Sequence, residues 1–323
     1  MPAAEWKIPR TAQPRPEDYA FDLDRALRAV MSLSSTVPAD AFTADTLGTE
    51  RAGNAVLIGE TGLVLTIGYL ITEASAIWLT LHDGRVLGGD VLGYDQESGF
   101  GLVQALGRLD IPPLPMGDSS AVKVGDKVVV AGAGGRPRSV AARVIAKQEF
   151  AGYWEYLLEE AIFTSPPHPH WGGTALIGAQ GELLGIGSLQ LQQERGGAEE
   201  NLNMLVPIDL LKPVLPAILE TGAPRREARP WLGFFATEVD GQVVIAGLAD
   251  GGPADAAGLQ VGDIILGVAG EEVEALAELY RRVWSLGNAG VEVPLRIHRM
   301  GRVHELTVRS TDRNHLLKRK VLH

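Results

Sequence analysis

The chain has 323 residues, 46% of them hydrophobic and 21% charged, which is the balance of a folded globular protein large enough for two domains. Its formal net charge of −11 excludes a general affinity for nucleic acid or for anionic membranes, because both need a basic surface. The absence of cysteine excludes disulfides, thiolate metal sites and a cysteine nucleophile.

The two ends are predicted to lie outside the folded domains. Residues 1–17 contain four prolines and no apolar run, which predicts a flexible arm and no signal peptide. No later segment is apolar over a length that spans a membrane. With Met1 as the native start we expect a cytoplasmic protein, whereas a chain trimmed of a leader would belong in the periplasm. Residues 313–323 form a basic tail, which we expect to be solvated.

Residues 18–220 show short β segments broken by glycine. The run Gly53–Ile58 enters a turn, and residues 77–81 alternate into Asp83-Gly84, a strong hairpin signal. No helical pattern separates these strands, so a closed antiparallel barrel or sandwich is favoured over a parallel sheet. The polar stretch 193–201 predicts an exposed loop, and residues 209–220 predict a helix.

A composition change marks a second domain. Residues 221–230 combine glycine, proline and charge without periodicity, as linkers do. The following 231–312 have the size of one small domain.

Several segments, in this order, resemble the HtrA (DegP-like) branch of the trypsin-like serine proteases. They are Gly62–Thr66, Asp83–Arg85, Val91–Asp95, Leu114–Ser119, Val124–Val128 and the pair Gly172-Gly173. The resemblance runs from about residue 28 to 312. It implies a mainly β fold: a trypsin-like double antiparallel β-barrel over 18–220, followed by a small α+β PDZ domain over 231–312.

The resemblance also locates the three catalytic positions of the family, and each holds an unsuitable residue. Tyr69 stands where the family has its histidine, Gly99 where it has its aspartate, and Trp171 where it has its serine. The mechanism needs a serine activated by a histidine that an aspartate orients. A tyrosine with a pKa near 10 is a poor base at neutral pH, and an indole has no nucleophilic oxygen. The resemblance therefore implies a degenerate site without catalytic residues.

Aromatic and histidine side chains near the Trp171 position could form a different pocket. Tyr153 and Trp154, with His168 and His170, are candidates for a repurposed cleft, since aromatic rings beside a few polar groups suit a binding site. The alternative is that these rings fill the former cleft and stabilise the barrel. A metal pair at His168 and His170 has no evident third ligand, so we expect no metal.

The second domain carries the clearer function. The run Trp231–Phe235 resembles the carboxylate-binding loop of PDZ domains, in which backbone N–H groups converge on a terminal carboxylate and the next strand pairs with the peptide. We expect Leu232, Gly233, Phe234 and Phe235 to bind peptide. Segments 251–259 and 261–270 match the family's following turn, short helix and strand.

A helix near 275–286 should form the other wall of the groove. We expect its Tyr280 and Val283 to face the ligand and its Leu279 to face inward. Because successive strand residues alternate, one of Phe234 and Phe235 faces the groove.

These features favour a non-catalytic scaffold or adaptor that binds peptide or protein C-termini with an apolar last residue, and not an enzyme. The alternatives are a chaperone-like holdase for unfolded clients, an enzyme of another class that uses the two histidines, and a serine endopeptidase. No cofactor is implied. HtrA-like proteins are usually trimers, so the resemblance implies a homotrimer with Tyr19, Phe21 and Phe42 as candidate contacts.

Overall fold

The computed structural model describes residues 6–195 and 198–318. Contacts divide the chain into two compact units. The first contains Met1–Gln148, Glu160–Arg225 and Lys318–His323, and the second contains Glu149–Glu159 and Arg226–Leu317. The second unit therefore includes an eleven-residue segment taken from the middle of the first unit's sequence.

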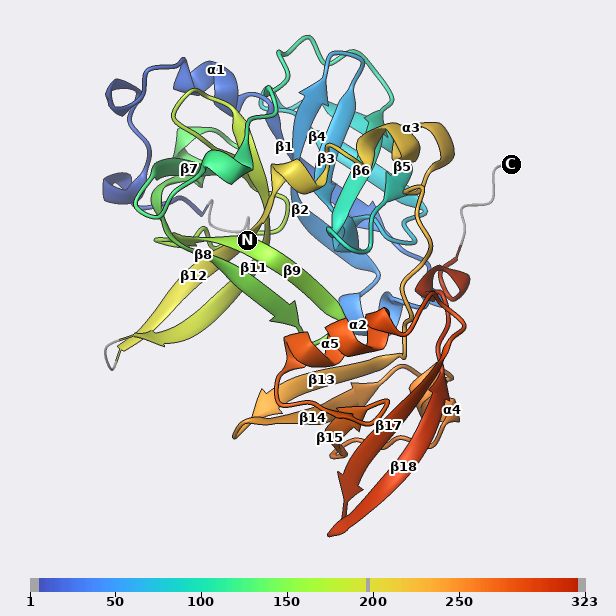
Figure 1. Ribbon diagram of the computed structural model, residues 1–323. Helices are drawn as coiled ribbons and strands as arrows, with labels where there is room; N and C mark the ends of the chain where they lie inside the picture. The colour runs from blue at the N-terminus through green and yellow to red at the C-terminus, as the bar shows by residue number, and fades with distance from the viewer. Residues whose placement is uncertain (1–5, 196–197, 319–323) are drawn as a thin grey trace. The chain divides into compact units, whose positions relative to one another are not determined.

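Six strands of the first unit close into an antiparallel barrel in the order β1-β2-β3-β6-β5-β4 (Figure 1). They are β1 (Val30–Thr36), β2 (Glu50–Gly59), β3 (Leu63–Ile67), β4 (Ala76–Thr80), β5 (Val86–Tyr94) and β6 (Phe100–Ala105). Strand β1 pairs with both β2 and β4, which closes the ring. The predicted hairpin joins β4 to β5, and the Asp83 carboxylate fixes its turn by accepting from the Arg85 N–H at 3.0 Å.

Six further strands form a second closed barrel in the order β10-β11-β12-β9-β8-β7. They are β7 (Lys127–Ala131), β8 (Ser139–Gly152), β9 (Tyr156–Ser165), β10 (Ala175–Ile177), β11 (Leu183–Arg195) and β12 (Ala198–Pro207). The core inside it is built from branched aliphatic residues such as Val130, Ile162 and Leu205, which suit a pleated surface buried on one side.

Part of the predicted N-terminal arm packs on this second barrel. Ile8 is buried in its core, and the Ile8 N–H donates to the Pro137 carbonyl at 2.8 Å. Trp6 and Ala12 pack against the same core, so the segment expected to be a flexible arm over 1–17 contacts the barrel through three apolar side chains. Residues 1–5 lie outside the described residues, as do residues 319–323 of the predicted basic tail.

The second unit is a single antiparallel sheet with two helices. Its strands follow the order β13-β14-β15-β17-β18, and β16 pairs with β15. The elements are β13 (Phe234–Val239), β14 (Gln242–Leu248), α4 (Pro253–Ala256), β15 (Ile264–Val268), β16 (Glu271–Glu272), α5 (Leu276–Ser285), β17 (Glu292–Arg299) and β18 (Arg302–Arg309). Together with the two barrels, this unit confirms the mainly β double barrel followed by a small α+β domain.

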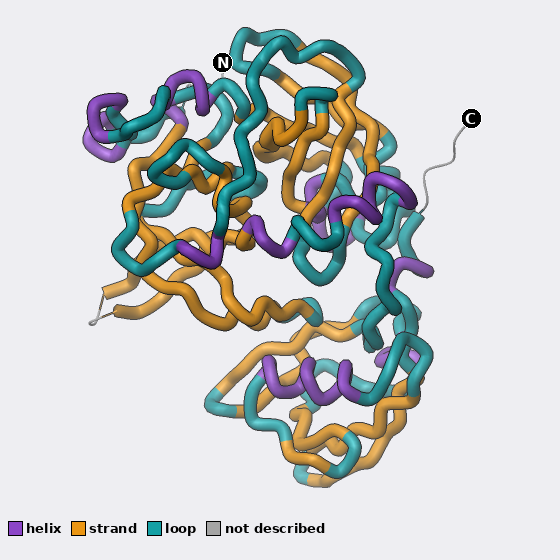
Figure 2. The backbone as a smooth tube through the Cα atoms, turned by 45° about the horizontal axis from the view of Figure 1, so that its top comes forward, coloured by secondary structure: helices purple, strands orange, loops and turns teal. Residues whose placement is uncertain are grey.

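Helices are short throughout both units, as Figure 2 shows. The first unit contains α1 (Leu23–Leu27), α2 (Ala44–Leu47) and α3 (Leu215–Thr221). The helix predicted over 209–220 is interrupted, because Pro213 separates a 3-10 turn at Ile208–Leu210 from α3. Within the described residues, no helix has the length and apolar character that would cross a membrane.

Candidate functional site

The structure brings the three predicted catalytic positions together between the two barrels. Tyr69 lies on a 3-10 turn at Gly68–Leu70, directly after β3, and the indole N–H of Trp171 hydrogen-bonds its hydroxyl. Gly99 lies beside this turn, where its carbonyl accepts from the Gly68 N–H at 2.6 Å. The Tyr69 hydroxyl donates to the Ser188 carbonyl at 2.9 Å, and burial raises its pKa above the usual tyrosine value. The tyrosine is thus held in place as a neutral hydrogen-bonding group.

The backbone after Trp171 is packed against the first barrel at contact distance. A Cβ on Gly173, whose φ is +75°, would lie 1.8 Å from the Asn54 carbonyl oxygen, and one on Gly172 would lie 2.6 Å from the Tyr69 hydroxyl. The Asn54 side-chain amide donates to the carbonyls of Gly172 and His170, both at 3.0 Å. These glycines are required because two barrels meet there with no room for a side chain.

His168 and His170 serve the packing of the second barrel. His168 is fully buried, and its Nδ1 accepts from the His170 N–H at 3.1 Å. Nδ1 is therefore unprotonated, and Nε2 donates to the Arg138 carbonyl at 2.9 Å. Burial lowers the pKa of His168. Both ring nitrogens are engaged, and the Trp6 ring packs on both histidines.

The residues of the predicted repurposed cleft are divided between the two compact units. Tyr153 and Trp154 belong to the second compact unit, whereas His168 and His170 belong to the first. Across the part of the chain that the structure describes, no three His, Cys, Asp or Glu side chains are placed to hold one metal ion.

The loop before β13 binds a carboxylate in this structure. The N–H groups of Leu232, Gly233 and Phe234 all point at the side chain of Glu155. Leu232 donates to Oε2 at 2.9 Å, and Gly233 and Phe234 donate to Oε1 at 2.7 and 3.4 Å. Gly233 has a φ of +80°, a left-handed conformation that turns successive N–H groups to one side. The predicted carboxylate-binding loop therefore has the geometry of an anion-binding nest.

Burial and hydrogen bonding oppose each other at Glu155. Burial raises the pKa of its carboxyl, the three backbone hydrogen bonds and the Arg313 charge lower it, and burial prevails, so the pKa is raised to about 7. Tyr280 of α5 also reaches this segment: its hydroxyl donates to the Gly152 carbonyl at 2.8 Å and accepts from the Glu155 N–H at 3.2 Å.

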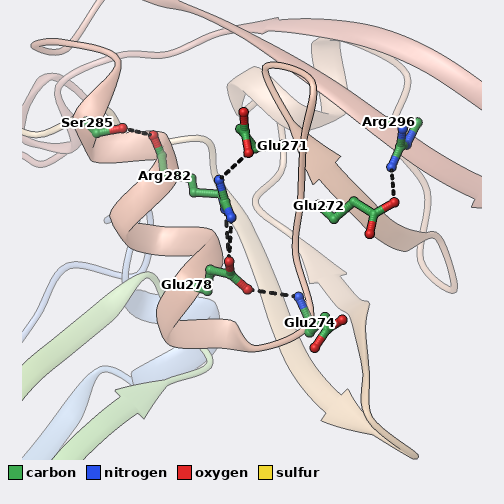
Figure 3. Close-up of polar contacts among 7 residues, drawn as sticks. All are labelled: Glu271, Glu272, Glu274, Glu278, Arg282, Ser285 and Arg296. Atoms are coloured by element: carbon green, nitrogen blue, oxygen red, sulfur yellow. Dashed lines mark hydrogen bonds and ion pairs between the residues drawn. The ribbon is translucent and has the colours of Figure 1, made fainter.

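Helix α5 is placed with one face in the core and the other in solvent. Leu279, Tyr280 and Val283 are all buried, and the Tyr280 hydroxyl is bonded to the segment that contains Gly152 and Glu155. On the opposite face, Arg282 forms ion pairs with Glu278 at 2.6 Å and Glu271 at 3.5 Å (Figure 3). The charged face of α5 therefore lies opposite the buried face that carries Tyr280.

Sequence reasoning missed Glu155. The available signal was a single acidic residue inside the aromatic-rich run 150–156, followed by the apolar pair Leu157-Leu158. Its partners lie 77 to 79 residues away along the chain, so their contact could not be read from a local pattern.

Comparison with known proteins identifies both units. Residues 53–186 match a model described as a trypsin-like peptidase domain, and residues 230–309 match a PDZ domain. A probable periplasmic serine endoprotease DegP-like of Pseudomonas fluorescens is 30% identical over 274 residues, covering 80% of this chain and 56% of that protein. The protein of the same name in Hahella chejuensis is 28% identical over 247 residues, covering 71% of this chain and 50% of that protein. The chain thus spans about half the length of these relatives.

Solved structures agree on the fold. The HtrA-type protease AlgW with a tripeptide superposes with a TM-score of 0.52 at 22% identity, covering 90% of this chain and 95% of that one. AlgW with a decapeptide gives a TM-score of 0.53 at the same identity and covers 97% of that chain.

Two expectations change in the light of these comparisons. The prediction that the chain is not an enzyme is contradicted, because the relatives are named serine endoproteases. The prediction of a cytoplasmic protein gains no support, because the same relatives are named periplasmic.

Proposed function

We propose that this chain, which belongs to the HtrA family of trypsin-like peptidases with a PDZ domain, binds peptide or protein C-termini through its PDZ groove. The observation that carries the proposal is the convergence of the Leu232, Gly233 and Phe234 N–H groups on one carboxylate. A loop that holds a side-chain carboxylate in this way supplies the same donors to a terminal one.

The groove favours an apolar last residue in the ligand. Leu232, Phe234, Tyr280 and Val283 are buried together in one cluster around the loop. An apolar side chain next to the bound carboxylate would extend this cluster, whereas a charged one would lose its hydration without a partner. The edge of β13 adds main-chain pairing, which is tolerant of sequence.

The test is fluorescence anisotropy with the full chain and matched peptides. Peptides ending in valine or leucine with a free carboxylate should bind, and their amidated forms should bind at least tenfold more weakly. Gly233→Ala should abolish binding, because a Cβ there would lie 2.9 Å from the Trp231 ring. Gly241→Ala is the control: its φ of +74° matches, and its Cβ would meet open space. Equal binding of free acids and amides would contradict the proposal and favour a holdase with little sequence preference.

A second candidate activity comes from the names of the relatives, which are serine endoproteases. It is tested by cleavage of unfolded casein and by labelling with a fluorophosphonate. The control combines Tyr69→His, Gly99→Asp and Trp171→Ser, which puts the family's triad residues at the three positions that the sequence resemblance implies. Cleavage and labelling of one serine in the wild type would locate its nucleophile, and their absence beside an active control would remove this candidate.

The proposal extends to location and assembly. The relatives' names favour the periplasm.

A homotrimer would use apolar residues near the N-terminus, and Tyr19, Phe21 and Phe42 are all partly exposed. The Tyr19 and Phe21 rings lie 5.5 Å apart. Sedimentation of the wild type and of Tyr19→Ser tests this assembly: a trimer that dissociates in the variant supports it, and a monomeric wild type contradicts it.

A further inference from the structure

We infer that residues 149–159 are an internal ligand of the PDZ groove, in which the Glu155 side chain stands in for a terminal carboxylate, so that an external C-terminus has to displace this segment. The inference rests on the proposed function, because it names what regulates access to the same groove. It goes beyond that function, because the groove could bind peptides without being occupied by its own chain.

The segment makes the two polar contacts expected of a groove ligand: a carboxylate in the loop and a main-chain hydrogen bond to β13 two residues earlier. The carboxylate of Glu155 occupies the loop, and two residues earlier the Tyr153 carbonyl accepts from the Ala236 N–H of β13 at 2.9 Å. Ala236 itself lies two residues after Phe234, the last donor of the loop. The segment thus makes one main-chain hydrogen bond to the edge strand β13 and places a carboxylate in the loop, two contacts that a C-terminal peptide makes when it binds by β-augmentation.

Apolar contacts accompany the polar ones. Leu157 is buried in the same core cluster as Leu232, Phe234 and Val283. The Tyr153 ring lies 6.0 Å from the ring of Phe235, a β13 residue outside the buried core. The segment therefore supplies an apolar side chain to the domain as well as a carboxylate, and both are features we propose for the external ligand.

The backbone at Glu155 is adapted to this role. Its φ of +57° is uncommon for a residue with a side chain and is costly unless the surroundings compensate. Here the chain turns back into β9 at the point where a peptide would end, and the left-handed conformation aims the side chain, in place of a main-chain terminus, into the loop. The Tyr280 hydroxyl accepts from the Glu155 N–H and so holds this turn.

One arginine forms ion pairs with both ends of the segment, an arrangement called the ion-pair clamp below. Arg281 of α5 contacts the carboxylates of both Glu149 and Glu159, the first and last residues of the segment. All three side chains are exposed, so the clamp contributes little to stability by itself. Its position is informative, because the same helix contacts the segment at its base through Arg281 and at its tip through Tyr280.

Occupation by a tethered segment raises the concentration that an external ligand needs. A segment of the same chain competes at an effective concentration in the millimolar range for a short connection. The apparent dissociation constant of an external peptide is therefore its intrinsic value divided by the fraction of molecules with a free groove.

The experiment measures external binding with and without the internal carboxylate. The probe is a fluorescein-labelled peptide that copies residues 148–154 and ends in one added valine with a free carboxylate. Glu155→Ala removes the internal carboxylate and leaves three loop N–H groups without their acceptor. Glu160→Ala is the control, because Glu160 is an exposed neighbour that pairs with Lys147 and not with the groove. Amide hydrogen exchange at Leu232, Gly233 and Phe234 is measured in parallel on all three proteins.

The inference predicts at least tenfold tighter probe binding to Glu155→Ala than to the wild type and to Glu160→Ala. Equal affinity for all three proteins would overturn it and leave the proposed function standing. If the probe binds none of the three proteins, hydrogen exchange decides. Faster exchange of the loop amides in Glu155→Ala would support the internal ligand and count against the proposed function. Unchanged exchange would overturn both. Should Glu155→Ala not fold, the wild type decides: loop amides that exchange as fast as the exposed Gly241 amide would refute occupation.

Discussion

Replacing Tyr280 by phenylalanine removes one oxygen atom that contacts the internal segment twice. The hydroxyl donates to the Gly152 carbonyl and accepts from the Glu155 N–H, and the Tyr280 side chain is 1% exposed. The aromatic ring remains, so packing against the stacked Trp284 ring is kept. We expect the free energy of opening the segment to fall by about 1–3 kcal/mol, the cost of losing hydrogen bonds in a buried place.

Amide hydrogen exchange of Leu232, Gly233 and Phe234 measures this opening free energy, because their N–H groups are bound to Glu155. A fall of about 1–3 kcal/mol corresponds to exchange roughly 5- to 150-fold faster. The control is Tyr94→Phe, which removes a tyrosine hydroxyl bound to Gln96 in the other unit and should leave these amides unchanged. A change of less than twofold in Tyr280→Phe would refute the reasoning that the hydroxyl holds the segment.

Three further outcomes are expected. Burial raises the pKa of Glu155 to about 7, above its value in an unfolded chain. The free energy that holds the segment is therefore greatest below about pH 4.5 and falls by up to ~3 kcal/mol as the pH rises through about 7. A nuclear magnetic resonance titration of Glu155 with a midpoint near the usual carboxyl pKa would contradict this. Gly173→Ala should lower the free energy of unfolding by more than about 3 kcal/mol in thermal unfolding, because its Cβ would overlap backbone atoms. The control Gly135→Ala has a similar φ of +74° but open space around its Cβ, so its loss of stability should be far smaller. Asn54→Ala removes the acceptor of the Ala133 N–H and the donor to the carbonyls of His170 and Gly172. Urea unfolding should show that the free energy of unfolding falls by about 2–4 kcal/mol. A fall below ~1 kcal/mol would refute the role of Asn54 in joining these backbone segments.

The strands were readable from the sequence where one face is apolar and a turn has a strong signature. The Asp83-Gly84 turn between β4 and β5 is an example, since the turn residues and the alternation agree. The stretch 193–201 was predicted to be an exposed loop, but β11 extends to Arg195 and β12 begins at Ala198. This hairpin is held by polar pairs such as Gln192 with Glu199 at 2.8 Å, so it lacks the apolar signal on which strand prediction depends.

The candidate site was predictable in part for a similar reason. The loop Leu232–Phe234 and the helix residue Tyr280 lie within one domain, and the sequence pointed to the loop by its family resemblance and to Tyr280 by its helical spacing. Glu155 lies in the turn between β8 and β9, far in sequence from the loop that it contacts, and its backbone there has a positive φ. Such a contact depends on three-dimensional position and leaves no local periodicity.

The most direct test of the account is a crystal structure of the full chain with a bound peptide that ends in valine with a free carboxylate. The account predicts that the peptide pairs with β13, that its carboxylate accepts from the N–H groups of Leu232, Gly233 and Phe234, and that Glu155 has left the loop. A peptide bound elsewhere, with Glu155 still held by these three groups, would contradict the claim that this groove binds C-termini.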